Sequence, residues 1–83
     1  MADETSTDIL TAVREITAEE AGVDLAKVSE TSRFADDLDI DSLGLLTIAT
    51  QVEERFGVAL DDSLIPTLAT VGSLVELVSS LRD

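Results

Sequence analysis

The sequence contains no cysteine, histidine, tryptophan or tyrosine. Without cysteine the chain has no disulfide framework, no thiolate metal site and no thiol nucleophile. Without histidine it lacks the commonest metal ligand and the usual general base near neutral pH. Phenylalanine is the one aromatic type present, so the core has to be built from Leu, Ile, Val and Ala. These absences argue against catalysis, and we expect a protein that is not an enzyme.

Basic residues are scarce as well. Five Lys and Arg stand against 18 Asp and Glu, which gives a net charge of −13. Nucleic acids and anionic membrane surfaces both require basic protein surfaces, so neither is expected as a partner. Partners should instead present basic patches, and salt should weaken their association. The hydrophobic content of 45% favours a folded domain over a disordered acidic chain.

The length of 83 residues fits a single domain over 1–83, in which residues 1–6 are expected to be a flexible N-terminal segment. The acidic start of the chain lacks the basic and apolar parts of a signal peptide. Its uncharged runs are shorter than the roughly 20 residues that span a bilayer. The sequence therefore predicts a cytoplasmic protein.

Three stretches have apolar residues at steps of three and four, the spacing of amphipathic helices. They are residues 7–21, 42–56 and 71–81. The residues able to cap them are Ser6, Thr7 or Asp8 for the first, Asp41 or Ser42 for the second and Thr70 for the third. Gly22 and Gly57 are expected to end the first two helices. Residues expected on the core faces include Ile9, Val13, Ile16, Leu45, Ile48, Ala49, Val52, Phe56, Val71, Leu74, Val75, Val78 and Leu81.

Two connections join these helices. Residues 22–41 form a long loop, a type that is usually functional or packed by its own side chains. The apolar residues expected to hold it against the helices are Val23, Leu25, Val28, Phe34 and Leu38. Residues 61–68 are predicted to form a short helical turn, with Pro66 tolerated only in its first turn. No segment alternates like a strand, so the fold class is all-α.

An acidic cluster immediately precedes one serine. Residues 36–43 read Asp-Asp-Leu-Asp-Ile-Asp-Ser-Leu. Asp37, Asp39 and Asp41 have the spacing of the first ligands of an EF-hand, but that loop then needs Gly at 42 and Glu at 48. Ser42 and Ile48 stand there instead. The EF-hand reading fails, whereas looser binding of a divalent cation stays open.

Ser42 has three interpretations. As a hydrolase nucleophile it lacks both a Gly-x-Ser-x-Gly turn and a histidine. As a helix cap it would be ordinary, since serine is among the commonest N-caps. As an attachment site for another enzyme it has a suitable setting, because Leu43 and Leu46 lie opposite the core face of the same helix. Thr47 and Thr50 share that face, and we expect the four to form a contact surface beside the serine.

The motifs around Ser42 resemble those of bacterial acyl carrier proteins of the dissociated fatty-acid synthase type, and of actinobacterial ones most of all. Asp-Ser-Leu at 41–43 is preceded by Phe-x-x-Asp-Leu at 34–38 and followed by Glu-Glu-Arg-Phe-Gly-Val at 53–58. The resemblance runs from about residue 9 into the third predicted helix, and so covers nearly the whole chain. It implies a monomeric four-helix bundle with a long ordered loop between helices one and two and a short third helix.

The resemblance also implies a function. Ser42 would receive 4′-phosphopantetheine from coenzyme A through a phosphopantetheinyl transferase, the holo-carrier synthase. Growing acyl chains would then be carried as thioesters on the arm, which supplies the thiol that the chain lacks. An aliphatic core of this kind is also expected to part between its helices for a short acyl chain.

Partners implied by the resemblance are enzymes with basic patches: malonyl transferase, ketosynthase, ketoreductase, dehydratase and enoyl reductase. The residues expected to meet them are Asp36, Asp37, Asp39, Asp41, Leu43, Leu46, Glu53 and Glu54. Gly44 and Thr47 depart from the family, which often has acids there. A carrier for polyketide assembly would suit this neutral segment and remains an alternative. An acidic helical module that binds proteins or cations is the alternative from another class.

Overall fold

The computed structural model describes the backbone of residues 2–82 and the side chains of residues 8–81. Its elements are α1 (Ala2–Ala21), the 3-10 turn η1 (Leu25–Lys27), α2 (Ser42–Phe56), the 3-10 turn η2 (Ile65–Thr67) and α3 (Val71–Arg82). Across residues 2–82 there is no strand, only an isolated β-bridge between Arg33 and Thr70. The all-α prediction is confirmed. The short third helix expected at 61–68 is the single turn η2.

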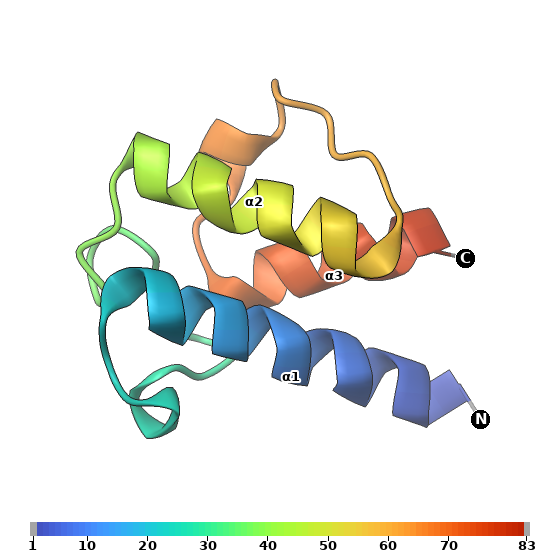
Figure 1. Cartoon of the computed structure of the whole chain (residues 1–83), viewed down its shortest axis with the longest axis horizontal. Coiled ribbons are helices and arrows are strands. Elements are labelled where there is room, and N and C mark those ends of the chain that lie inside the picture. The colour runs from blue at the N-terminus through green and yellow to red at the C-terminus, as the bar shows by residue number, and fades with distance from the viewer. Residues whose placement is uncertain (1, 83) are drawn as a thin grey trace.

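Helix α1 packs against both other helices and closes the bundle (Figure 1). Helices α2 and α3 run in the direction opposite to α1, so the start of α1 and the end of α3 lie at the same side of the molecule. Turn η2 packs against α2. The long loop between α1 and α2 lies at the other side, where α2 begins.

The ends of the helices follow capping rules, with one exception. The Asp41 carboxylate caps α2 by accepting a hydrogen bond from the Gly44 N–H at 2.8 Å. Gly57 ends that helix in the left-handed conformation, with φ 66°. The predicted start of α1 is wrong, because the helix begins at Ala2 and the three expected caps lie inside it. Residues 2–6 have no apolar stripe in the sequence from which a helix could be predicted.

Most of the apolar residues predicted for the core are buried, Phe56 and Val23 are partly buried against it, and two are exposed. Leu25 is exposed because η1 is held through its backbone: the Arg14 Nη2 donates to the Leu25 carbonyl at 3.1 Å. Leu81 is exposed because it lies in the last turn of α3, beyond the buried Val78. The largest fully buried side chain is that of Phe34, from the long loop, so the loop forms part of the core.

Main-chain hydrogen bonds join the long loop to the start of α3. The bonds, called here the loop–α3 pairing, run from the N–H of Phe34 to the Ala69 carbonyl (3.1 Å), from Val71 to Ser32 (3.0 Å) and from Gly72 to Glu30 (2.7 Å). A Cβ at Gly72 would stand 3.1 Å from the Glu30 carbonyl oxygen, so a residue without a side chain suits this approach. From α1, the Arg14 Nε donates to the Val28 carbonyl at 2.6 Å. The loop is therefore held by α1 on one side and by the start of α3 on the other.

Candidate functional site

Ser42 is the first residue of α2, and its side chain is exposed. Because Asp41 is the N-cap, Ser42 is not needed as one. Within the part of the chain that the structure describes, no hydrogen bond involves the Ser42 hydroxyl. The interpretation of Ser42 as a mere helix cap is therefore wrong. Its oxygen is open to a reagent from solvent, and no histidine exists to activate it.

A groove of about 580 Å³ begins at Ser42. Its walls are the 33–41 part of the long loop, the first turn of α2 and the segment from η2 to the start of α3. Its apolar lining consists of Phe34, Ala35, Ile40, Leu45, Ile65, Pro66, Leu68 and Ala69. Its polar lining consists of Arg33, Asp36, Asp41, Ser42 and Thr70. An exposed hydroxyl thus stands at the edge of a largely apolar space.

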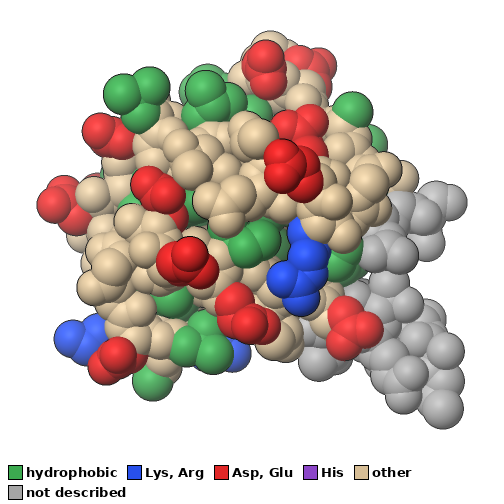
Figure 2. Space-filling view, in the orientation of Figure 1, with side chains coloured by type: hydrophobic (Ala, Val, Ile, Leu, Met, Phe, Trp, Pro, Cys, Tyr) green, Lys and Arg blue, Asp and Glu red, His purple; other side chains and the backbone are tan. Residues whose placement is uncertain are grey.

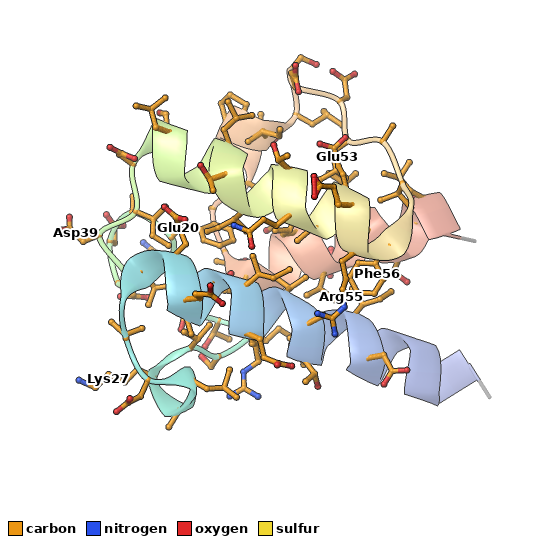
Figure 3. The ribbon with its side chains drawn as sticks, in the orientation of Figure 1. Glu20, Lys27, Asp39, Glu53, Arg55 and Phe56 are labelled. Atoms are coloured by element: carbon orange, nitrogen blue, oxygen red, sulfur yellow. The ribbon has the colours of Figure 1, made fainter. Side chains whose placement is uncertain are left out.

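Most of the acids before Ser42 have structural contacts within the protein. The Asp37 Oδ2 accepts from the Arg33 N–H at 2.8 Å, which closes the turn. The Asp36 Oδ2 lies 3.3 Å from the Arg33 Nη1, and Asp41 caps α2. Asp39 differs, because it has a positive φ of 56° and points away from the molecule (Figure 3). Its carboxylate is the one most openly presented to a partner.

Glu53 and Glu54 lie at the other end of α2, about 18 Å along the axis from Ser42 at 1.5 Å per residue. The Glu53 Oε2 accepts from the Leu60 N–H at 2.9 Å and so holds the connection that follows the helix. Figure 3 shows Glu53 on the side of α2 that faces this connection. Glu54 is exposed. The two acids are therefore separate from the serine site, and only Glu54 has its carboxylate free of such a contact.

The exposed face of α2 beside Ser42 is apolar. Leu43 is 74% exposed and Leu46 44% exposed. The hydroxyls of Thr47 and Thr50 donate to the carbonyls of Leu43 and Leu46, each at 3.0 Å, so their polar atoms are satisfied within the helix. Figure 2 shows hydrophobic side chains gathered over the start of α2 and the neighbouring η2 segment. The two leucines are therefore exposed as expected, and their contact with a partner stays a prediction.

Glu20, at the end of α1, was missed by sequence reasoning. Its carboxylate points to the start of α2 (Figure 3). The Glu20 Oε2 would lie 3.7 Å from a Cβ placed on Gly44, and the Ile40 Cγ2 would lie only 2.9 Å from it. A side chain at position 44 would press on Ile40, which gives a reason why glycine stands there in place of the acid that the sequence resemblance leads one to expect. Glu20 supplies negative charge there from another helix, and no sequence spacing signals that approach.

Two further observations concern metal ions and membranes. Among the side chains of residues 8–81, no group of three acids is placed to hold a metal ion, so the acidic loop is not a built cation site. Of the helices described, none is long and apolar enough to cross a membrane.

Comparison with known proteins gives one consistent result. The chain matches the family described as "Phosphopantetheine attachment site" over residues 11–78. It is 41% identical over 75 residues to the acyl carrier protein of Micrococcus luteus, covering 90% of this chain and 93% of that one. The acyl carrier protein of Myxococcus xanthus is 41% identical over 71 residues, covering 86% and 90%. The meromycolate extension acyl carrier protein of Mycolicibacterium smegmatis is 37% identical over 79 residues, covering 95% and 80%.

Proposed function

The chain belongs to the acyl carrier protein family, and on this basis we propose that Ser42 carries the 4′-phosphopantetheine arm on which acyl chains are held as thioesters. Members of this family are carriers and not catalysts, and phosphopantetheine is their cofactor. The observation that carries the assignment to Ser42 is the exposed hydroxyl without a hydrogen bond at the edge of the apolar groove. Asp41 frees that hydroxyl by capping the helix itself.

The attachment step needs a second enzyme. The Ser42 Oγ forms a bond to the phosphorus next to the pantetheine of coenzyme A and loses its proton. The bond from that phosphorus to the adenosine 3′,5′-bisphosphate breaks, and this group leaves. Since the chain has no histidine, we expect the proton acceptor and the Mg²⁺ to come with the phosphopantetheinyl transferase.

The start of α2 suits the product of this step. A phosphodiester on Ser42 would lie at a helix N-terminus, where backbone N–H groups and the positive end of the dipole favour an anion. The acids of the loop oppose it, and this keeps the phosphate at the solvent edge of the groove. The arm is therefore rooted where it can swing out to a partner or fold back over the protein.

The groove gives the arm and a short acyl chain an apolar place on the carrier. Its volume of about 580 Å³ is in the roughly 300–1,000 Å³ range of small-molecule sites. Each methylene taken out of water there contributes about 0.8 kcal/mol. An acyl chain can thus begin in a preformed groove, without first parting the helices.

We assign the carrier to dissociated fatty-acid synthesis, where it would meet malonyl transferase, ketosynthase, ketoreductase, dehydratase and enoyl reductase in turn. A relative named for meromycolate extension supports a fatty-acyl cargo. The alternative is polyketide assembly, because the first turn of α2 contains no acid. In either pathway the surface offered to the enzymes centres on Leu43 and Leu46. The exposed carboxylates of Asp39, Asp41 and Glu20 lie beside it, and Glu54 lies farther along α2.

Intact mass measurement tests the assignment. The apo protein is incubated with coenzyme A, Mg²⁺ and a phosphopantetheinyl transferase. The wild type and a Ser80→Ala control, which removes another exposed helical serine, should gain the mass of one phosphopantetheine group, and Ser42→Ala should gain none. No gain in the wild type, or a gain that persists in Ser42→Ala, would reject the proposal in favour of an interaction module or another attachment residue.

A further inference from the structure

Arg33 is the one basic residue among those that line the groove beginning at Ser42. Its backbone is fixed on two sides: its N–H donates to the Asp37 Oδ2 at 2.8 Å, and it forms the β-bridge with Thr70. Its side chain is held much less firmly. The Arg33 Nη1 lies 3.3 Å from the Asp36 Oδ2, and the two side chains are 64% and 72% exposed. The backbone of Arg33 is therefore fixed, while its guanidinium is exposed and held by one weak contact.

The ion pair with Asp36 is weak enough to exchange. Solvent-exposed pairs contribute about 0–1 kcal/mol, and this one has a single contact at the long end of hydrogen-bond distances. The planar guanidinium has donors to spare, and its fork matches two phosphate oxygens. A phosphodiester competes well for such a group.

The charge around Ser42 makes the exchange favourable. Asp36 and Asp41 line the same groove, so a phosphodiester on Ser42 adds a third negative group to its edge. Like charges in one groove repel one another, and salt screens the repulsion only partly. Arg33 is the one positive charge among the residues that line the groove, so it can offset this repulsion from within the groove.

We propose that Arg33 leaves Asp36 and binds the phosphodiester of the arm on Ser42, so that the root of the arm is held over the groove. The proposal rests on the attachment of the arm to Ser42. Arg33 acts as a positioning residue: it fixes the first charged group of the arm, and the pantetheine then follows the apolar lining toward Leu45 and Ile65. The chain thereby favours the folded-back position of its arm until a partner draws it out.

Nuclear magnetic resonance of the apo and holo forms of the full chain tests this proposal. Holo protein is made with coenzyme A, Mg²⁺ and a phosphopantetheinyl transferase, and its mass is checked. The Nε–Hε resonance of Arg33, assigned by its loss in Arg33→Ala, should shift on modification. The corresponding resonance of Arg55, which lies about 20 Å from Ser42 along the axis of α2, should stay in place. The ³¹P resonance of the holo wild type should differ from that of holo Arg33→Ala and match that of holo Arg55→Ala.

A third variant gives the opposite change. Asp36→Ala removes the competitor for Arg33. On modification its Arg33 resonance should shift further than in the wild type, and its ³¹P resonance should lie further from that of holo Arg33→Ala. Raising the salt concentration should reduce all these shifts. If modification is confirmed by mass and the Arg33 resonance does not move, this proposal is rejected while the attachment to Ser42 stands. Absence of the mass gain rejects both.

Discussion

The Asp41 Oδ1 accepts a hydrogen bond from the Gly44 N–H at 2.8 Å, and this bond closes the first turn of the helix that begins with Ser42. The acid directly before the attachment residue is therefore a structural cap as well as a charge. These two roles can be separated, because asparagine caps helices as well as aspartate does but carries no charge.

Substitution of Asp41 should separate stability from recognition. Asp41→Asn should leave the free energy of unfolding nearly unchanged, whereas Asp41→Ala should lower it by about 1 kcal/mol. Both should slow modification by the transferase, since both remove a charge that its basic surface would meet. Urea unfolding and initial rates of mass gain measure the two effects. Equal modification rates for Asp41→Asn and the wild type at low salt would contradict the electrostatic role.

Thr17 carries a polar atom that the fold does not satisfy. Its side chain is fully buried, and its Oγ1 has no hydrogen-bond partner. Thr17→Val replaces the hydroxyl by a methyl group of similar size, so it should raise the free energy of unfolding by about 1 kcal/mol. Thr17→Ser keeps the hydroxyl and loses the methyl group, so it should lower that free energy by about 0.8 kcal/mol. A stability loss in Thr17→Val would show that the hydroxyl is bonded.

The adjacent acids Glu53 and Glu54 should respond differently to alanine. Glu53→Ala removes the acceptor of the Leu60 N–H and should cost about 1.5–3 kcal/mol of stability. Glu54 is exposed, so Glu54→Ala should change stability by less than about 0.5 kcal/mol. Only the Glu54 variant should weaken a basic partner without a change in unfolding midpoint. Similar stability losses for both would contradict the contact of Glu53.

Leu46 and Ile48 lie two residues apart on α2 and face opposite environments. Leu46 is 44% exposed and Ile48 is fully buried. Leu46→Ala should therefore lower the rate of malonyl transfer to the holo carrier while leaving stability within about 0.5 kcal/mol of the wild type. Ile48→Ala should cost about 2–5 kcal/mol in stability. A large drop in the melting temperature of Leu46→Ala would show that Leu46 belongs to the core.

Asp61 should titrate below the usual range of an aspartate. The Ser63 hydroxyl and then the Ser63 N–H hydrogen-bond its carboxylate and lower its pKa. Because the pKa is lower in the folded state, the stabilisation is present above the unfolded-state pKa and is lost as pH falls through the folded-state pKa. Carboxyl ¹³C shifts against pH should show this low midpoint, and Ser63→Ala should raise it. A midpoint unchanged by Ser63→Ala would contradict the hydroxyl bond.

The helices could be predicted from the sequence because local patterns determine them. Residues such as Ile9, Val52 and Val78 recur with the helical period and are buried. Asp41 and Gly57 match the types that begin and end helices. The start of α1 could not be predicted in this way, since residues 2–6 have no apolar period. Leu25 and Leu81 fit the apolar pattern but are 40% and 45% exposed, because neighbouring elements cover them only in part.

The candidate site was predictable only where it is local in sequence. Ser42, Leu43 and the acids before them are neighbours in the chain, and the surface they form follows from one helix and its cap. The groove, in contrast, needs Ile65 and Leu68 from a distant segment. Glu20 and Arg33 reach the site through the packing of α1 and the path of the long loop. Such long-range approaches leave no periodic signal.

The loop–α3 pairing has a consequence for the size of the cargo. Two walls of the groove are tied to each other through main-chain groups of residues 30–34 and 69–72, so the tie does not depend on the side chains that line the groove. The room inside depends instead on side chains such as Leu45, Ile65 and Leu68. Preference for longer or shorter acyl chains can thus be altered by changing that lining, with the loop–α3 pairing kept intact.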